Sequence, residues 1–358
     1  MRWDRYAGRD VIPLWVADSD FRSPRAVRDA LAARVEHGVF GYSSPPEELR
    51  SAIVEYLERR HAWRVLPEWI VFLPGVVPGL HLSARRLLAP DEHALVPRPV
   101  YQHLKRAPEL APRPFTEVPL VLEHGRWVFD LDALRAARTP RTRVLYLCNP
   151  QNPGGTVFTP AELTRLAESV PGCIIVSDEI HCDLVLDPAA RHVPIASLAP
   201  EVSRRAVTLM SANKTFNFPA AGCGWAVIED AKLRAAMALE LQAHVLPSPS
   251  VFGYAATLAA LTRGAPWLAA LIGYLRRNRD LVQGAMPLPM AAVQATFLAW
   301  IDARALPNAH QRFLDGGVAL SPGEQFGAPG FVRLNFATQR ARLEEALRRM
   351  NAAIRSAG

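Results

Sequence analysis

Residues 211–217, Ser-Ala-Asn-Lys-Thr-Phe-Asn, are the stretch from which the fold of this chain is best worked out. They follow an apolar run at 207–210 and contain Lys214, one of only three lysines among 41 basic residues. A lysine amine can lose its proton and attack a carbonyl group, whereas an arginine guanidinium stays charged and cannot. Lys214 is therefore our candidate for a lysine that forms a Schiff base, with an ordinary surface lysine as the alternative.

Two other apolar runs also end in polar side chains. The run 144–147 leads to Asn152, and the run 174–176 leads to Asp178. If these runs are parallel strands, Asn152, Asp178 and Lys214 gather at their carboxyl ends, where open α/β sheets bind ligands. Strands that alternate with helices along the chain predict a mostly parallel sheet with helices on both faces.

Length and composition limit the class of protein. At 358 residues the chain is long enough for two structural lobes, and its 50% hydrophobic and 21% charged residues are typical of a globular enzyme. The net charge is +7, but the arginines are scattered, so we expect no nucleic-acid partner. The four cysteines lack metal-ligand spacing and favour a reducing compartment. No apolar run approaches membrane-spanning length, and we expect a cytoplasmic protein without a metal or a membrane partner.

The sequence also predicts local elements and domains. We expect a helix near residue 80 after the strand 70–73, a hairpin at 117–129, and helices at 160–169 and 340–355. The turn between the strand and the first of these helices would present free backbone amides to an anion. The expected domains are an N-terminal arm with part of the small domain (1–44), a large domain (45–268) and a smaller α+β domain (269–358).

A reactive lysine, a buried acid and a phosphate site together are what pyridoxal phosphate chemistry requires. Lys214 would bind the cofactor aldehyde and later act as the base at the α-carbon of the substrate. Asp178 would keep the pyridine nitrogen protonated. Asn152 and His181 would hydrogen-bond the phenolic oxygen of the ring, and Tyr101 would lie on the ring face.

Phosphate and substrate need binding groups of their own. The backbone of Val76 and Val77, together with Ser211, would hold the cofactor phosphate, and Arg333 would bind a substrate carboxylate through both of its terminal nitrogens. Structural roles remain open for the same residue types. An ion pair is the alternative for Arg333, and a helix cap, a hydrogen-bonded loop histidine and a core tyrosine are the alternatives for Asp178, His181 and Tyr101.

From end to end the chain resembles the fold-type I pyridoxal phosphate enzymes of the class I/II aminotransferase superfamily. Within them it is most similar to the cystathionine β-lyase branch, the carbon–sulfur lyases of the MalY/PatB type. The stretches that carry the resemblance are 13–18 (Pro-Leu-Trp-Val-Ala-Asp), 41–43, 60–63, 68–77, 149–154, 177–181, 214–217 and 333–337.

The resemblance implies a fold, an assembly and a reaction. The fold would be a mostly parallel seven-stranded sheet between helices, with a smaller α+β domain. The assembly would be a homodimer with shared active sites, in which Tyr42 reaches the cofactor phosphate of the neighbouring subunit. Ala17, Asn152 and Arg333 would contact an amino-acid substrate. The reaction would be α,β-elimination of L-cysteine S-conjugates to a thiol, pyruvate and ammonia.

Some positions depart from the pattern of the superfamily. Gly222 stands where many aminotransferases have an arginine, Ser19 and Gly155 replace larger residues, and 218–221 is altered to Phe-Pro-Ala-Ala. These changes border the substrate side, so they affect the substrate more than the cofactor. An aminotransferase acting on an L-amino acid is the alternative function, and a regulatory protein on the same fold is a third.

Overall fold

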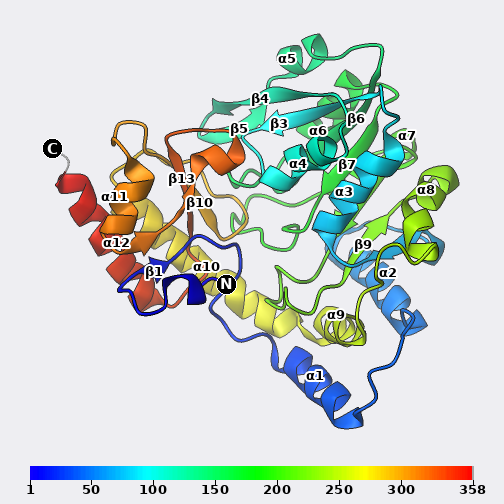
Figure 1. The fold of residues 1–358 in the computed structure, drawn as a ribbon, viewed down its shortest axis with the longest axis horizontal. Coiled ribbons are helices and arrows are strands. Elements are labelled where there is room, and N and C mark those ends of the chain that lie inside the picture. The colour runs from blue at the N-terminus through cyan, green and yellow to red at the C-terminus, as the bar shows by residue number, and fades with distance from the viewer. Residues whose placement is uncertain (357–358) are drawn as a thin grey trace.

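The computed structural model describes residues 1–356 and contains a large sheet with the strand order β2-β9-β8-β7-β6-β3-β4-β5 (Figure 1). In this order the strands are β2 (Ile70–Leu73), β9 (Gly224–Val227), β8 (Ala206–Met210), β7 (Ile174–Asp178), β6 (Thr142–Cys148), β3 (His93–Arg98), β4 (Phe115–Glu123) and β5 (Arg126–Phe129). The four central pairings, from β8 to β4, are parallel, and the three at the edges are antiparallel. The predicted α/β fold class is therefore confirmed.

The sheet has eight strands where the resemblance implied seven. The added edge strand is β5, which pairs with β4 in the predicted hairpin, with Leu120 opposite Phe129 and Glu123 opposite Arg126. Leu120 and Val128 are buried in this hairpin, so an apolar side holds it against the rest of the molecule.

Helices cover both faces of the large sheet because its central strands are apolar on both sides. The α-helices of residues 1–356, including those outside these two faces, are α1 (Arg25–His37), α2 (Glu47–His61), α3 (Val76–Leu87), α4 (Gln102–Leu110), α5 (Leu131–Ala136), α6 (Pro160–Ser169), α7 (Pro200–Ser203), α8 (Ala231–Gln242), α9 (Val251–Arg263), α10 (Ala265–Ala285), α11 (Ala309–Asp315) and α12 (Arg340–Arg355). Along β6, Val144 and Tyr146 pack with α3 and α4, while Leu145 and Leu147 pack with α5 and α6.

A smaller set of strands lies to one side of the large sheet, with α11 and α12 (Figure 1). It consists of an antiparallel sheet in the order β10-β13-β12 and a parallel pair, β1 with β11. The strands are β10 (Leu298–Asp302), β13 (Phe331–Asn335), β12 (Ser321–Pro322), β1 (Ile12–Pro13) and β11 (Val318–Ala319). Through β1 the N-terminal arm is joined to this region. The domain limits remain a prediction, and the one expected between residues 268 and 269 falls inside α10.

Helix α3 begins at Val76, four residues before the helix start predicted near residue 80. Pro78 does not prevent this, because residues in the first turn of a helix have no intrahelical partner for their N–H groups. A Cβ atom on Gly79 would lie 2.8 Å from Leu73 and 3.0 Å from Leu209, so the absence of a side chain lets α3 approach the sheet closely. The earlier start turns Val76 and Val77 from loop residues into first-turn residues.

Two further elements differ from expectation. The arm contains a short 3-10 helix at Asp4–Tyr6, and α4 follows Tyr101; neither helix was predicted from the sequence. Within residues 1–356, no single helix is long and apolar enough to cross a membrane; α9 and α10 meet that test only as a pair, bent by 80°.

Candidate functional site

The three polar residues predicted to gather do lie at one edge of the sheet. Asp178 is the last residue of β7, Lys214 follows β8 and Asn152 follows β6. These strands are parallel neighbours, with Cys148 opposite Asp178 and Asp178 opposite Leu209. Their carboxyl ends therefore bring all three loops to the same edge.

Lys214 has the environment of a reactive amine. Its Nζ atom donates a hydrogen bond of 2.5 Å to the backbone oxygen of Ala17. Burial, together with the positive charge of Arg333, lowers the pKa of Lys214 to about 8, against the opposing charges of Asp18 and Asp178. A substantial fraction of this amine is consequently neutral near pH 8, as a nucleophile or a base must be.

Asp178 is a buried carboxyl group with few partners. Its Oδ1 atom accepts one hydrogen bond, of 3.2 Å, from the backbone N–H of Ile180. Burial raises the pKa of Asp178 to about 7, although this hydrogen bond and the charge of Lys214 oppose the rise. No helix begins at Asp178, so the helix-cap alternative is wrong. In the described part of the chain, no cationic N–H group donates a hydrogen bond to the Asp178 carboxyl group, so its ionised form would be stabilised by a ligand that brings such a donor.

His181 also has an unsatisfied atom. Its Nδ1 is buried without a hydrogen-bond partner, and its ring lies 5.8 Å from the ring of Phe297. Burial, then the charges of Lys214 and Arg333, lower the pKa of His181 to about 3. The imidazole is therefore neutral and has a nitrogen free for a ligand, unlike a loop histidine with both nitrogens bonded.

Tyr101 and Asn152 lie next to each other at this edge. The backbone N–H of Tyr101 donates a 2.9 Å hydrogen bond to the backbone oxygen of Asn152. Burial, with the negative charge of Asp178, raises the pKa of Tyr101 to about 12, so the phenol is neutral. Tyr101 is thus close to Asp178, as a residue that covers the face of a ring bound there would be.

Arg333 projects from β13 and is almost completely buried. Its Nη1 donates to Asn152 Oδ1 and its Nη2 to the backbone oxygen of Trp15, both at 3.0 Å. The guanidinium lies 4.6 Å from the ring centroid of Phe326. Its Nε has no partner, and burial lowers the pKa of Arg333 to about 10.

The polar partners of Arg333 are all neutral; the remaining one is the Ser321 hydroxyl at 3.3 Å. No carboxylate of residues 1–356 forms an ion pair with it, so the structural ion-pair alternative is wrong. A buried cation without an anion is costly, and binding a carboxylate would remove that cost.

The first turn of α3 has free backbone N–H groups at the place where the sequence predicts an anion site. The N–H groups of Val76 and Val77 have no intrahelical acceptor, and the positive end of the helix dipole faces the turn at Gly75. A Cβ atom on Gly224 would lie 2.9 Å from the carbonyl carbon of Gly75, so this glycine allows β9 to approach the turn.

Ser211 lies near this turn, but its hydroxyl is already engaged. It donates to the backbone oxygen of Cys223 at 2.7 Å and accepts from the N–H of Asn213 at 3.2 Å. The hydroxyl would have to turn away from Cys223 to donate to a phosphate.

Tyr42 is separate from the other candidates within a single chain. It lies in the loop between α1 and α2, and its side chain is fully exposed. The structure therefore brings together the other candidates and leaves Tyr42 at the surface.

Two asparagines form part of the site that sequence reasoning did not single out. Asn335 and Asn217 donate hydrogen bonds to backbone oxygens of the arm segment 15–21, whose Ala17 accepts the hydrogen bond from Lys214. The accepting residues are Val16 and Asp18 for Asn335, and Ser19 and Phe21 for Asn217. Asn335 lies in the stretch 333–337 with Arg333, and Asn217 lies in the stretch 214–217 with Lys214. Their places in these two motifs are the sequence feature from which they could have been identified.

Two of the unusual glycines have structural reasons. Gly155 has a φ of +76°, a conformation that side chains other than glycine rarely adopt. A Cβ atom on Gly222 would lie 2.8 Å from the backbone oxygen of Pro74, so an arginine at this position would displace the turn before α3. The local backbone conformation therefore explains why glycine stands at both positions.

Comparison with known proteins gives a consistent result. A sequence model of the family described as aminotransferase class I and II matches residues 9–350. Cystathionine beta-lyase PatB of Bacillus subtilis (strain 168) is 34% identical over 373 residues, covering 99% of this chain and 96% of PatB. A crystal structure of OvoB is 42% identical with a TM-score of 0.95, covering 99% of this chain and 96% of that one.

A more distant relative gives the same fold. Cystalysin from Treponema denticola, whose crystal structure contains pyridoxal 5'-phosphate, is 26% identical with a TM-score of 0.94. The match covers 99% of this chain and 95% of that chain. Since the family model also matches nearly the whole sequence, this chain belongs to the class I and II aminotransferase family.

Proposed function

We propose that this chain is a pyridoxal phosphate-dependent carbon–sulfur β-lyase that acts on L-cysteine S-conjugates such as L-cystathionine. The observation that carries the proposal is the convergence of the Lys214 amine, the Asp178 carboxyl group and the unpaired guanidinium of Arg333 at one edge of the sheet. Its similarity to PatB along nearly its full length favours lyase chemistry over other reactions of the family.

The residues present fit this cofactor. Lys214 would hold its aldehyde, Asp178 its pyridine nitrogen, and Tyr101 its ring face. The unpartnered Nδ1 of His181 and the amide of Asn152 would serve the phenolic oxygen. The first-turn amides at Val76 and Val77, with Ser211, would hold the phosphate. When bound, pyridoxal phosphate supplies an electron sink that stabilises negative charge at the α-carbon of the substrate.

The residues of the chain have separate tasks in this reaction. Arg333 binds the substrate carboxylate through its fork of N–H donors, with Asn152 and the backbone of Ala17 beside it. The neutral Lys214 amine takes the α-proton. Asp178, ionised once it faces a cationic ring nitrogen, keeps that nitrogen protonated. Loss of the α-proton and of the thiolate from the β-carbon, followed by hydrolysis with one water, gives a thiol, pyruvate and ammonia.

An aminotransferase would use the same residues, so only the fate of the substrate distinguishes it from a lyase. The test is pyruvate release from L-cystathionine by the purified, cofactor-loaded protein with no keto acid present. Sustained release over many turnovers supports the lyase. No pyruvate, or one turnover that only an added keto acid allows to repeat, would overturn the proposal in favour of an aminotransferase.

We further propose a homodimer in the cytoplasm, with Tyr42 reaching the cofactor phosphate of its partner. Helix α1 and the loop after it expose Val35, Val39, Phe40 and Tyr42, a concentration of large apolar side chains that is typical of an interface. The free, buried cysteines are consistent with a reducing compartment. Light scattering coupled to size-exclusion chromatography would give the mass of a dimer, and a monomer with full activity would refute shared sites.

A further inference from the structure

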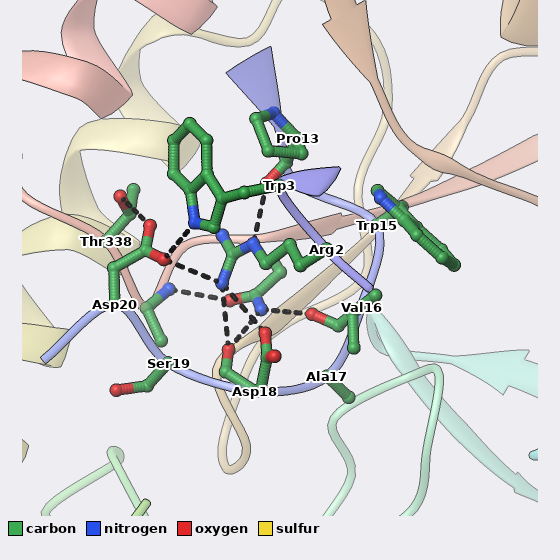
Figure 2. Close-up of polar contacts among 12 residues, drawn as sticks. Arg2, Trp3, Pro13, Trp15, Val16, Ala17, Asp18, Ser19, Asp20 and Thr338 are labelled. Carbon is green, nitrogen blue, oxygen red and sulfur yellow. Dashed lines mark hydrogen bonds and ion pairs between the residues drawn. The ribbon is translucent and has the colours of Figure 1, made fainter. Parts of the chain in front are cut away.

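Arg2 is a buried arginine at the base of the N-terminal arm, far in sequence from the residues of the site. Its Nε donates to the backbone oxygen of Pro13 at 2.7 Å. Its Nη1 reaches Asp18 twice, the backbone oxygen at 3.2 Å and the carboxylate at 3.0 Å, and lies 3.4 Å from the Asp20 carboxylate. One guanidinium therefore joins both ends of the segment 13–20 (Figure 2).

Asp20 connects this junction to the smaller sheet region. Its carboxylate accepts from the indole of Trp3 at 3.1 Å and from the hydroxyl of Thr338 at 2.6 Å, and it pairs with Arg342 at 3.2 Å. Its backbone N–H donates to the oxygen of Ala337 at 2.9 Å. The far end of the segment is thus anchored close to α12, and Arg2 ties the near end to it.

The middle of the same segment faces the amine of the proposed active site. Ala17 accepts the hydrogen bond from Lys214 Nζ, and the charge of the adjacent Asp18 acts on this amine. Trp15, two residues earlier, accepts from Arg333. The segment therefore covers Lys214 and limits the access of water to it.

We propose that Arg2 is a positioning residue for Lys214: it clamps the segment 13–20 so that the Ala17 oxygen and the Asp18 carboxylate stay beside the amine. The catalytic consequence rests on the proposed function, because it requires Lys214 to be the cofactor amine. The geometric consequence does not, because the clamp exists in the chain itself.

The charge state of Lys214 should report whether the clamp is closed. The charged groups that act on the amine are Asp18 from the segment, Asp178 from β7 and Arg333 from β13. Burial is the largest cause of its low pKa. Opening the segment would hydrate the amine, so its pKa should rise from about 8 toward the ordinary value of 10.5.

The experiment compares the parent protein with Arg2→Gln, Arg2→Lys and Arg9→Gln in the full chain. Arg9 is the matched control because it belongs to the same arm, is exposed and lies over the ring of Tyr6 at 5.7 Å. Hydrogen–deuterium exchange of peptides covering 13–21 is measured with and without pyridoxal phosphate. The rate at which acetic anhydride acetylates Lys214 is measured against pH in the cofactor-free protein.

Arg2→Gln should speed exchange in 13–21 and raise the pKa of Lys214 seen in acetylation. At pH values below the pKa, a rise of one pKa unit lowers the neutral fraction of the amine, and with it the acetylation rate, about tenfold. Arg2→Lys keeps a positive charge near Asp18 but loses the guanidinium group that also donates to the Pro13 oxygen. Its exchange rate in 13–21 and its Lys214 pKa should therefore lie between those of Arg2→Gln and the parent protein. Arg9→Gln should change neither. In the loaded enzyme, Arg2→Gln should raise KM more than it lowers kcat, because Ala17 lies on the substrate side.

The outcomes separate this inference from the proposed function. Unchanged exchange and acetylation in Arg2→Gln would overturn the clamp while leaving the lyase assignment intact. If Arg2→Gln unfolds, Arg2→Lys decides: exchange and acetylation equal to the parent values would show that the fork to Pro13 is not needed and would refute the clamp. A Lys214 that binds no cofactor, with the clamp effects present, would instead refute the proposed function.

Discussion

The hydroxyl of Thr215 donates a 3.3 Å hydrogen bond to the carboxylate of Asp183, and this contact joins the loop that carries Lys214 to the loop that follows Asp178. The same carboxylate lies 3.2 Å from Nε of Arg60 and 3.3 Å from Nε2 of His61, at the end of α2. A buried carboxylate thus connects a helix terminus with the loop that follows β8.

Asp183 is the ionised member of the group that it forms with Arg60, His61 and Thr215. Burial alone would raise its pKa, but the hydrogen bond and charge of His61, with Arg60, lower the pKa of Asp183 to about 2. His61, Cys182 and Asp183 place potential ligand atoms within 4.8 Å of one another, as in a metal site. Burial raises the pKa of the Cys182 thiol, and Arg60 pairs with the carboxylate, so the contacts in this structure are those of an ion-paired support.

Asp183→Asn should destabilise the fold by about 1–3 kcal/mol, because it leaves buried donors without their charged acceptor. Urea unfolding at pH 7 measures this loss. Asp132→Asn is the control, since that side chain is 94% exposed in its pair with Arg135, and it should change the free energy of unfolding by less than about 0.5 kcal/mol. Equal effects of the two substitutions would show that the Asp183 group contributes nothing special to stability.

Elements with strong local signals could be predicted from the sequence. Helix α6 has the predicted bounds because Thr159 and Glu162 form a reciprocal capping pair before an apolar stripe. Helix α12 also has the predicted bounds, 340–355. The start of α3 was misplaced because Pro78 was interpreted as part of a turn, although proline is compatible with the first turn of a helix.

The site was predictable where strand order fixes the position of a residue. Asp178 and Lys214 each follow a buried strand, and parallel pairing of β7 with β8 brings them together. The role of Arg2 could not be predicted, because its contact with Asp18 depends on the path of the arm over β13 and not on a local pattern. Tyr42 shows the other limit, since its proposed role in a neighbouring subunit would leave it exposed and without a partner in its own chain.

Lys214→Ala should abolish the visible absorbance of covalently held cofactor and lower kcat by at least about 10³, because both the nucleophile and the base are lost. Absorbance spectra and pyruvate release measure the two effects. Lys232→Ala, at an exposed position of α8, is the matched control and should behave like the parent protein. Retained absorbance together with full turnover in Lys214→Ala would exclude this lysine as the cofactor amine.

Asp178→Asn should have opposite effects on stability and on turnover. The raised pKa of about 7 means that the folded, cofactor-free chain keeps Asp178 protonated while the unfolded chain ionises near 3.8. Stability is therefore lost as pH rises from about 4 to 7, and Asn, which cannot ionise, should restore roughly 2–4 kcal/mol at pH 8. Urea unfolding of the cofactor-free variant at pH 4 and pH 8 measures this gain, which should nearly vanish at pH 4, close to the unfolded-state pKa.

The same substitution should slow α-proton removal strongly, because an amide cannot hold the ring nitrogen in its protonated form. Exchange of the α-proton of a substrate into deuterium oxide follows this step directly. A variant that matches the parent protein in exchange rate would refute the role of Asp178, whatever its stability.

Arg333→Lys should raise KM for L-cystathionine about 10- to 100-fold with a smaller change in kcat. Lysine keeps the positive charge but loses the planar fork that donates to both Asn152 and a substrate carboxylate. Arg304→Lys is the control, because that side chain is an exposed arginine paired with Asp302 in the same small-sheet region.

The specific readout for Arg333 is a substrate analogue whose α-carboxylate is replaced by an amide. The parent protein should bind this analogue much more weakly than L-cystathionine, and Arg333→Lys should discriminate far less between the two compounds. A purely structural role would weaken binding of both by the same factor and lower the thermal midpoint. Equal discrimination in the variant and the parent protein would therefore assign Arg333 to the support of Asn152 and Trp15, and would leave the substrate carboxylate without its proposed partner.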